Sequence, residues 1–512
     1  MPEAVAPTAV ASGSTNAKLA AATTTTTFTE VGPVEIPDLD SFPPTGTPIH
    51  PKLASWDFYR SLHSPQRIVA PMVDQSELPW RILSRRYGSD LVYTPMINAK
   101  LFVDDASRKK KVKYQEVNFN KEFGEEGAAL LSSEGEGCSA DSDRPLFVQF
   151  CSNDPSTLLK AAQVVEDRCD AVDLNLGCPQ HIARRGHYGS YLMEDWPLIF
   201  ALINNLHLNL KIPVTAKMRV YESTEKTVAY ARLLERAGAQ IITVHGRTRA
   251  MKGHFTGLAD WAKIRAVKQA VGVPVFANGN VLYPGDFDKA LAGTGADGVM
   301  SAEGNLYNPA IFARTIERGP MFPHAPELPF PSITAMANEY LDIVASLRTP
   351  TQSSAIKAHL FRLCRPALEV HKELREHLGK SRFDGAAKGE GRVAMYRAFV
   401  AELEQRLEAD RKSGKWDERP ETMLPGSVSY LTQGEGVYVP HWLAQPYFRP
   451  PLVPGEEGGK AKEAKSRAEQ MTSVEDVQTK GEEKVVAEEK MRRARSESVE
   501  TNQAGKKVKL DE

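Results

Sequence analysis

A cysteine directly after a short apolar run is the residue best suited to proton chemistry in this sequence. Cys178 follows the run at residues 171–176, is fixed by Pro179 and precedes a loop that carries Arg184. A thiol with an ordinary pKa of about 8.5 is mostly protonated near neutrality, so it can act as an acid. Nearby arginine and histidine side chains could instead lower that pKa and give a thiolate nucleophile. A buried structural thiol is the third interpretation.

Polar side chains recur at alternate positions of the neighbouring apolar runs. Alternate residues of a strand face the same side, so these side chains share one interior face, where buried polar groups need partners. Any single one could be a hydrogen-bonded structural residue, but several at successive strand ends predict a site. The residues are Gln149, Asp173, Asn175, Thr215, Lys217, Arg219, Thr243, His245 and Arg247.

Two further strand ends carry small residues suited to an anion. Asn278, Gly279 and Asn280 end the seventh apolar run, and Ala302 and Glu303 end the eighth, just before Gly304. Small residues let backbone N–H groups approach a phosphate, and a helix starting after residue 304 would point its positive end there. Asn-Gly-Asn is also a common turn sequence. Its position after the seventh strand favours a phosphate site.

The elements that must position these residues form a regular alternation. Eight apolar runs alternate with helical patterns over about residues 60–330, which predicts an α/β (β/α)8 TIM barrel; a doubly wound sheet is the competing fold. A segment at 114–144, rich in Gly, Glu and Ser, is expected to be a surface insertion. The runs lie at 67–73, 91–96, 146–150, 171–176, 214–220, 241–245, 273–277 and 298–302.

The strand pattern stops after about residue 332. Amphipathic patterns at 333–347, 353–378 and 393–411 predict three helices, forming a small all-α domain over 333–411. An extended segment with prolines and aromatic residues is expected at 412–450. Residues 1–50, rich in Ala, Thr and Pro, and the charged residues 451–512 are expected to be disordered tails.

Composition limits the function classes. The net charge is −1, so any nucleic-acid affinity must come from local patches, such as Lys357, His359, Arg362 and Arg365 at near-helical spacing. The five cysteines are scattered without metal-type spacing, which predicts a reducing compartment and no metal. No apolar run of about 18 residues and no signal-peptide pattern is present, so no membrane association is expected. A basic cluster at 505–511 resembles a nuclear import signal or a solubilising tail, so we expect a cytoplasmic or nuclear location.

Six short motifs occur in an order that resembles the tRNA-dihydrouridine synthase family over about residues 60–410. The segment Val-Pro-His-Trp-Leu-Ala-Gln-Pro-Tyr at 439–447 and the long tails are similar to the eukaryotic branch acting on D-loop positions 16 and 17. The motifs are Ala-Pro-Met-Val-Asp at 70–74, Asn-Leu-Gly-Cys-Pro at 175–179, Ala-Lys-Met-Arg at 216–219, Val-His-Gly-Arg-Thr at 244–248, Ala-Asn-Gly-Asn at 277–280 and Ala-Glu-Gly at 302–304.

The resemblance implies an FMN-dependent enzyme that reduces the C5=C6 bond of uridine in tRNA, with NADPH or NADH as reductant. It implies that Cys178 is the catalytic acid. The implied flavin-binding residues are Pro71, Met72 and Val73 along the isoalloxazine ring, Gln149, Lys217 and His245 as polar partners, and Asn278, Gly279, Asn280, Ala302 and Glu303 at the ribityl-phosphate end. The candidate substrate contacts are Asn175, Arg184 and Arg219 near the thiol, and Lys357 and Arg362 in the helical domain.

Two other functions fit parts of the same pattern. One is a flavin-dependent reductase or dehydrogenase of a free pyrimidine, which would not need a helical docking domain. The other is a non-catalytic RNA-binding flavoprotein, which would not need Cys178, Lys217 and His245 together. The helical domain and the complete polar set therefore favour a tRNA-modifying enzyme.

Overall fold

The structure is a computed structural model that describes residues 35–103, 118, 143–253, 256–313, 330–347, 349–416, 428–430 and 436–447. From Pro37 onward the described residues belong to one compact unit. The predicted tails at 1–34 and 448–512, and nearly all of the predicted insertion at 114–144, lie outside the described residues. No described helix is both long and apolar enough to cross a membrane.

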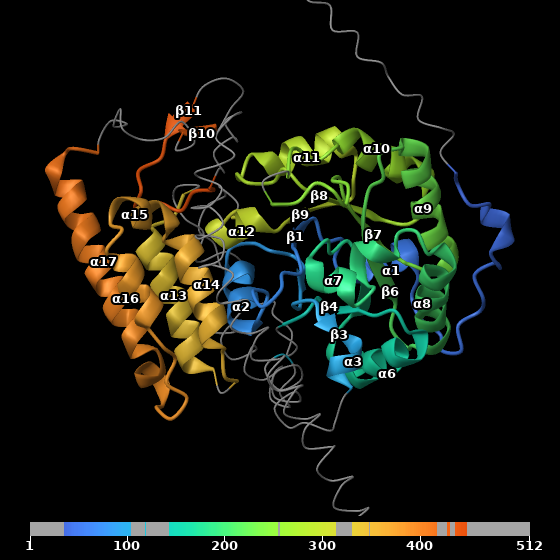
Figure 1. Cartoon of the computed structure of the whole chain (residues 1–512), viewed down its shortest axis with the longest axis horizontal. Helices are drawn as coiled ribbons and strands as arrows, with labels where there is room; N and C mark the ends of the chain where they lie inside the picture. Colours follow the sequence, from blue (N-terminus) through green and yellow to red (C-terminus); the bar gives the residue numbers. More distant parts are fainter. Residues whose placement is uncertain are drawn as a thin grey trace, which may run out of the picture. The chain divides into compact units, whose positions relative to one another are not determined.

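In the described part of the chain, nine parallel strands form the barrel sheet, which is seen at the centre of the barrel helices in Figure 1. The chain of paired strands runs from β1 through β9 and down to β4 and β2, and β3 also pairs with β4. A parallel bridge between Ile68 and Leu91 joins β1 to the start of β2 and closes the circle. The predicted TIM barrel is therefore confirmed. The strands are β1 (Arg67–Val69), β2 (Val92–Tyr93), β3 (Ile97–Asn98), β4 (Leu146–Cys151), β5 (Ala171–Leu176), β6 (Val214–Arg219), β7 (Ile242–His245), β8 (Val275–Asn278) and β9 (Gly298–Ser301).

The second predicted strand, at 91–96, is wrong in one respect. Only β2 lies within this range, and β3 begins just after it at Ile97, because Pro95 between them lacks the N–H that a strand ladder requires. The neighbouring Thr94 compensates: its N–H donates to the Phe147 carbonyl at 3.0 Å, and its hydroxyl oxygen accepts from the Gln149 N–H at 3.1 Å. The break thus brings a polar side chain to the strand that carries Gln149.

Helices surround the strands, and their ends follow from local sequence. Asp154, Asp195, Ser223 and Asp260 each accept a backbone N–H at a helix N-terminus, and Gly238 ends one helix in the left-handed conformation. The barrel helices are α2 (Leu78–Arg86), α3 (Ala99–Phe102), α6 (Pro155–Val165), α7 (His181–Arg185), α8 (Trp196–Asn209), α9 (Thr224–Ala237), α10 (Trp261–Ala270), α11 (Asp286–Thr294) and α12 (Glu303–Tyr307).

The interior of the barrel is divided along its axis. At the amino ends of the strands, large apolar side chains form a separate buried cluster, which includes Phe147, Phe276 and Met300. Phe58 of α1 (Ser55–Ser61) joins this cluster and stacks on Phe147, with ring centroids 5.9 Å apart. Because this end is filled with hydrocarbon, the polar interior side chains occupy the carboxyl ends of the strands.

The C-terminal region is helical, as predicted, but one boundary is wrong. The expected single helix at 353–378 is three helices, because the chain leaves helical geometry at Cys364 and Pro366 at the start of the next helix has no N–H to donate. The helices are α13 (Ile333–Ser346), α14 (Ser353–Leu363), α15 (Arg365–Val370), α16 (Leu374–Lys380) and α17 (Ala394–Ser413). In Figure 1 they stand together beside α2 and α12, and α13 packs on α2 while α14 packs on α12.

A buried ion pair joins these helices to the barrel. Glu77, at the start of α2, accepts from the Tyr340 hydroxyl at 2.7 Å and lies 3.0 Å from Nε2 of His359 on α14. The Trp80 ring stacks on the His359 ring at 3.9 Å. Burial acts to raise the pKa of Glu77, but His359 and Tyr340 outweigh it and hold the pKa below its ordinary value.

Residues 439–447, here named the C-terminal clasp, follow a hairpin of β10 (Val428–Tyr430) and β11 (Gly436–Tyr438). The Ile333 N–H donates to the Trp442 carbonyl at 3.1 Å, and the Ala444 N–H donates to Pro331 at 2.8 Å. Leu443 and Val439 pack in a cluster with Tyr283, which follows β8. The predicted extended segment at 412–450 therefore contains a hairpin, and its first residues belong to α17.

The predicted disorder of residues 1–50 is wrong for residues 37–50. Phe42 packs against Phe200 with ring centroids 5.6 Å apart, and its carbonyl accepts from Arg236 at 2.8 Å. The Ile49 N–H donates to the Leu208 carbonyl at 2.8 Å. The composition of the whole tail predicted disorder, but these local partners hold its last part against α8 and α9.

Candidate active site

Three polar side chains form a hydrogen-bonded row across β4, β5 and β6. Strand register places Gln149 beside Asp173 and Asp173 beside Thr215. Gln149 Nε2 donates to one carboxylate oxygen of Asp173 at 2.8 Å, and the Thr215 hydroxyl donates to the other at 2.7 Å. Burial raises the pKa of Asp173 to about 6, although both hydrogen bonds and the nearby Lys217 act to lower it.

Asn175 extends this row to the cysteine. Its Nδ2 donates to Gln149 Oε1 at 2.7 Å, while its Oδ1 accepts from the N–H groups of Gly177 at 3.1 Å and Cys178 at 2.9 Å. Both ends of the amide are thus used within the protein. A continuous chain of hydrogen bonds runs from Asp173 to the backbone of Cys178, and we name it the relay.

Cys178 lies on a tightly constrained loop and is half-buried. Gly189 approaches so closely, with φ of +65°, that a β-carbon there would lie 2.8 Å from the Cys178 carbonyl oxygen. Ser190 donates to that same oxygen through its hydroxyl at 3.0 Å. Burial raises the pKa of the Cys178 thiol, outweighing the N–H of Gln180 and the charges of nearby basic residues. Burial thus favours the thiol over the thiolate at this position.

Arg219 braces the cysteine loop from the next strand. Its Nε donates to the Gly177 carbonyl at 2.7 Å, and its Nη1 donates to the carbonyls of Thr248 at 2.8 Å and Met251 at 3.1 Å. The side chain is buried. These contacts hold the loops that follow β5 and β7, and the substrate contact expected for Arg219 stays a prediction.

Lys217 of β6 and His245 of β7 both lie toward the carboxyl ends of their strands, where the register sets Lys217 opposite Thr243 and His245 opposite Arg219. Lys217 Nζ donates to Asn278 Oδ1 at 2.9 Å, and burial lowers the pKa of this lysine to about 8. Burial also holds the pKa of His245 well below its ordinary value, with Lys217, Arg219 and Arg247 acting in the same direction. The neutral His245 ring therefore accepts at Nε2 from Arg247 Nη1, 3.0 Å away.

The ends of β8 and β9 form a close-packed backbone surface. Gly279 has φ of +114°, and a β-carbon there would lie 2.6 Å from Ala259. Asn280 also has positive φ, and its Oδ1 accepts from the Ala259 N–H at 2.8 Å. Ala302 and Glu303 are half-buried at the start of α12, which begins at Glu303 rather than after residue 304. The amide of Asn280 thus holds the loop, and Gly279 leaves room for the Ala259 and His245 side chains to pack against its backbone.

The segment after β1 is the most open part of this rim. Pro71 and Met72 are half-buried, and Val73 is 41% exposed. The Met72 N–H donates to the Ser76 hydroxyl at 2.8 Å, and Asp74 has a φ of +55°. The turn that follows this rim segment is therefore fixed, while Val73 remains available for contact.

The basic stripe predicted on one helix is wrong as a continuous surface. His359 is fully buried against the barrel, and Arg365 lies on α15 beside Glu369. Lys357 donates to the Gly379 carbonyl at 2.6 Å, and Arg362 donates to the Ala358 carbonyl at 3.2 Å. Helical spacing alone did not reveal that Glu77 and Trp80 of the barrel cover the face carrying His359.

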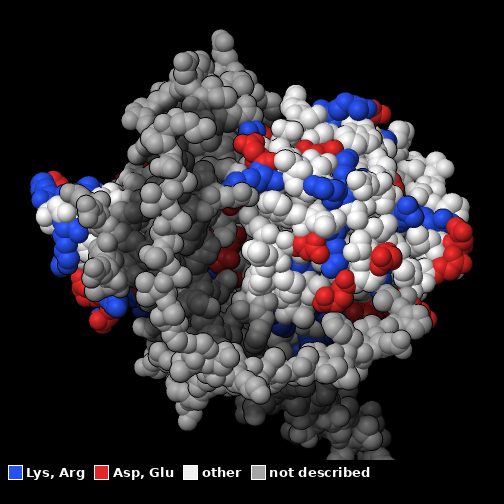
Figure 2. Space-filling view, turned by 90° about the horizontal axis from the view of Figure 1, so that it is seen from above, with Lys and Arg blue, Asp and Glu red and all other residues white. Residues whose placement is uncertain are grey.

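Charge on the exposed barrel face is mixed. Figure 2 shows Lys and Arg interspersed with Asp and Glu over the described part of this face. Part of this mixture is local pairing, such as Lys263 with Asp260 at 3.3 Å. Arg184, by contrast, is an exposed residue of α7, directly after the cysteine loop.

Two basic residues near the thiol were not singled out by sequence reasoning. Lys252 Nζ donates to the Pro179 carbonyl at 3.1 Å, and Arg249 Nη1 donates to the Ser190 carbonyl at 3.1 Å. Both come from the basic run at 247–252 that follows β7. The polar strand end with His245 and Arg247 could have pointed to them, because the basic residues continue for five positions beyond Arg247.

Comparison with known proteins agrees with the barrel and the motifs. Residues 68–399 match the family model for dihydrouridine synthase. A Mus musculus protein is 42% identical over 419 residues, covering 81% of this chain and 75% of its own length. Proteins from Saccharomyces cerevisiae and Schizosaccharomyces pombe are 45% and 41% identical, covering 87% and 92% of their own lengths and 78% and 79% of this chain. The names of all three contain tRNA-dihydrouridine(16/17) synthase and NAD(P)(+). The chain belongs to the dihydrouridine synthase family.

Proposed function

We propose that this protein is an FMN-dependent tRNA-dihydrouridine synthase that reduces the C5=C6 bond of uridine at D-loop positions 16 and 17, using NADPH or NADH. Family membership and the names of three relatives support the reaction and the positions. The observation that carries the proposal is a half-buried cysteine whose backbone N–H is held at the end of the relay, on the loop that follows β5.

The polar end of the barrel fits a flavin. The Lys217 ammonium can donate three hydrogen bonds and uses one on Asn278, so it keeps N–H donors and positive charge for a planar, anionic ligand. We assign Pro71, Met72 and Val73 to the ring, Gln149, Lys217 and His245 to its polar edge, and Asn278, Gly279, Asn280, Ala302 and Glu303 to the phosphate end. When bound, FMN would supply hydride transfer from the nicotinamide to the pyrimidine ring.

The protein's own residues supply the proton. Saturating C5=C6 adds a hydride at one carbon and a proton at the other, and burial raises the pKa of the Cys178 thiol, which favours the proton-carrying form. Asn175 fixes the backbone N–H of Cys178, and Arg219 fixes the carbonyl of Gly177. The backbone that carries the thiol is thus held in one place while the substrate base moves into position.

A uridine must leave the folded D-loop to reach this site. We propose that the barrel at 60–330 carries the flavin and that the helical domain at 333–411 contacts the tRNA, with Lys357 and Arg362 among its contacts. Arg184 is exposed directly after the cysteine loop, where it can meet a phosphate. Asn175 and Arg219 then act on the substrate mainly through Cys178. We propose a cytoplasmic or nuclear location, which imaging of the tagged full chain would test.

The test is dihydrouridine mapping on tRNA that lacks this modification. Wild-type protein should purify yellow and form dihydrouridine at positions 16 and 17, and it should leave free uracil unchanged. Cys178→Ala should keep the flavin and lose at least about 100-fold in rate, the usual contribution of a general acid. Cys364→Ala, which removes a buried thiol outside the site, is the matched control and should remain active.

Each contrary result removes a defined part of the proposal. A Cys178→Ala variant with unchanged rate would refute the acid assignment. A colourless protein that does not bind added FMN would refute the flavin assignment. Modification at another tRNA position would refute positions 16 and 17, and turnover of uracil alone would favour a free-pyrimidine reductase.

A further inference from the structure

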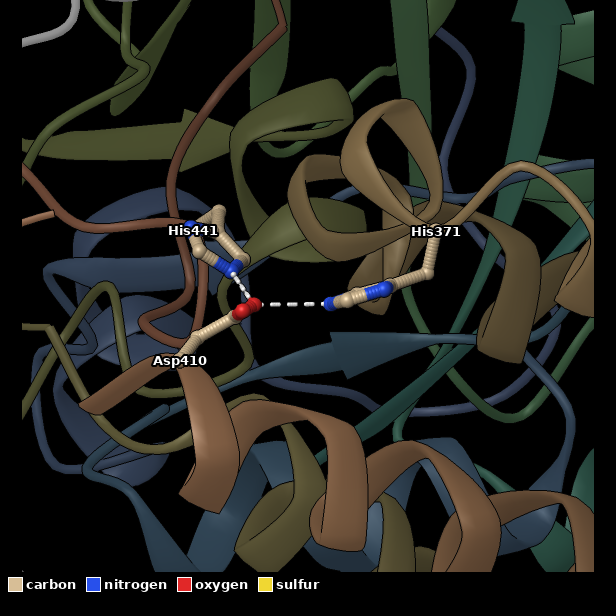
Figure 3. Close-up of side chains that lie close together, drawn as sticks. All are labelled: His371, Asp410 and His441. Atoms are coloured by element: carbon tan, nitrogen blue, oxygen red, sulfur yellow. Dashed lines mark hydrogen bonds and ion pairs between the residues drawn. The ribbon is translucent and has the colours of Figure 1, made fainter. Parts of the chain in front are cut away.

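The side chains of two histidines and an aspartate converge at one point (Figure 3), and none of the three belongs to the barrel strands or to the cysteine loop. His371 follows α15, Asp410 lies on α17, and His441 belongs to the clasp. Nε2 of His371 lies 2.7 Å, and Nε2 of His441 lies 2.8 Å, from the same oxygen of Asp410, Oδ2. All three atoms lie within 4.8 Å of one another, and no other trio of such side chains in the described ranges meets this spacing.

This arrangement differs from the other histidine–carboxylate pairs of the molecule. His377 Nδ1 lies 2.8 Å from Glu402, and His359 pairs with Glu77, so each of those carboxylates meets one imidazole. At Asp410 two ring nitrogens are directed at one oxygen atom. Without a metal, two N–H protons fill the space between these atoms. A divalent cation can replace such protons, because metal ligation requires the deprotonated nitrogen.

We propose that His371, Asp410 and His441 bind a zinc ion, with water as the fourth ligand. Two imidazole nitrogens and one carboxylate oxygen are a donor set that suits Zn²⁺. Zinc bonds of about 2.0–2.1 Å place tetrahedral ligands roughly 3.3 Å apart, so the trio needs to open by only about half an ångström. The side chains of His371 and Asp410 are 14% and 18% exposed, which leaves an approach for the ion and the water.

The second nitrogens of the two imidazoles have different surroundings, and among the described residues none accepts a hydrogen bond from Nδ1 of the buried His441 ring. A metal on Nε2 requires the proton of His371 to be on Nδ1, and Nδ1 faces the carboxylate of Glu373 at 3.8 Å. The other ligand is shielded: the His441 side chain is 1% exposed, and its ring lies 4.6 Å from the Trp416 ring and 5.1 Å from the Trp442 ring. One side of the trio is therefore closed by aromatic groups and the other is open to solvent.

The consequence of zinc binding would be structural. The three ligands come from three separate segments, so the ion would tie the clasp to α15 and α17 and close the long connection between Asp410 and His441. The clasp in turn pairs with residues 331–333 and packs Leu443 near Tyr283 of the barrel. Zinc would thus stabilise the attachment of the clasp to both parts of the fold. The expectation of no metal rested on cysteine spacing and did not consider ligands so far apart in the chain.

The experiment uses untagged full-length protein. Zinc content is measured by inductively coupled plasma mass spectrometry, and chelator-treated protein is then titrated with Zn²⁺ in competition with a chromophoric chelator. Wild type should hold one zinc ion per chain and melt at a higher temperature with zinc than without. His441→Ala and Asp410→Asn should weaken zinc binding by at least about tenfold and lose the zinc-dependent rise in melting temperature. His377→Ala, which alters a single pair in the same region, is the matched control and should bind zinc normally.

Two results would overturn the proposal. Wild type without bound zinc and without a thermal response would leave the trio as a hydrogen-bonded cluster only. Equal zinc binding by both ligand variants would place the ion elsewhere. If His441→Ala fails to fold, the zinc affinity of Asp410→Asn and the visible spectra of Co²⁺-loaded wild type and Asp410→Asn test the proposal instead. The amide introduced by Asp410→Asn keeps an acceptor for one imidazole, whereas a tetrahedral cobalt band should disappear with the carboxylate. None of these measurements depends on dihydrouridine formation.

Discussion

The relay makes Asn175→Asp a sensitive probe of the site. Its outer end is fixed, because the N–H groups of Gly177 and Cys178 can only donate, and an aspartate at 175 satisfies both. The second oxygen of that aspartate would then face Gln149 Oε1, an acceptor against an acceptor. If the Gln149 amide turned so that its Nε2 donated to that aspartate, its Oε1 would face the Asp173 carboxylate instead, and two acceptors would again meet. A proton on the carboxyl of Asp173, or on the carboxyl introduced at position 175, removes this repulsion between acceptors. The folded variant should therefore bind one proton that folded wild type does not.

The size of the effect follows from that proton. One buried hydrogen bond left unmade costs about 1–3 kcal/mol, which raises the pKa of the relay carboxyls by about 1–2 units from the value near 6 of Asp173. The unfolded chain holds no such proton above about pH 5. Stability of the variant therefore falls as pH rises, by about 1.4 kcal/mol per pH unit, and by about 1–3 kcal/mol relative to wild type between pH 6 and pH 8.

Urea unfolding of the flavin-free proteins at pH 6, 7 and 8 measures this difference. Asn175→Ala is the control: it removes the same hydrogen bonds without adding a carboxyl, so its loss of stability should be the same at each pH. If the free energies of unfolding of Asn175→Asp and Asn175→Ala both changed with pH as that of wild type does, the assignment of donors and acceptors in the relay would be wrong. Dihydrouridine formation by Asn175→Asp, relative to wild type, should also recover as the pH falls, because the relay positions Cys178.

Three further outcomes test other contacts. Glu77→Ala should lower the free energy of unfolding by about 3–5 kcal/mol in urea titrations, since it leaves buried His359 and its neighbours unpaired. Glu77→Gln should lower it by less, and an equal loss in the two variants would contradict the pairing of Glu77 with His359. Because the pKa of Glu77 is lowered in the folded protein, wild type should lose this stabilisation as the pH falls below about 4, and Glu77→Gln should not. The affinity of wild type for FMN, measured by quenching of FMN fluorescence, should fall as the pH rises through about 8, because the pKa of Lys217 is lowered to about 8. Lys217→Met should bind FMN weakly at every pH, and affinities equal to those of wild type would remove Lys217 from the flavin site.

Much of the fold was predictable because buried parallel strands leave a clear pattern. The runs at 171–176 and 214–220 are almost the observed β5 and β6, and the alternation within them placed Asp173 and Lys217 in the interior. The residues of the site were therefore found before their contacts were known. The relay itself was not predictable, because the pairing of Asn175 with Gln149 depends on register and side-chain rotamers.

The errors come from contacts between distant segments. His359 has the sequence spacing of an exposed basic residue, but Glu77 and Trp80, far away in the chain, bury it. Residues 37–50 have the composition of a disordered tail, yet Phe42 and Arg236 supply specific partners. Local patterns do not contain this information, since the stabilising partner lies in another element.

The closure of the barrel also determines the order in which the protein can form during synthesis. β1 takes its full set of sheet partners from β9, where Arg67 lies opposite Val299. A chain emerging from the ribosome must therefore keep its first strand only partly paired until the last strand has been made. The joint at residues 331–333 waits longer still, because its partners at 442–444 are among the last described residues to be translated. If the chain were released early, the unpaired edge of β1 and the backbone groups at residues 331–333 would be exposed to pairing with strands of other chains.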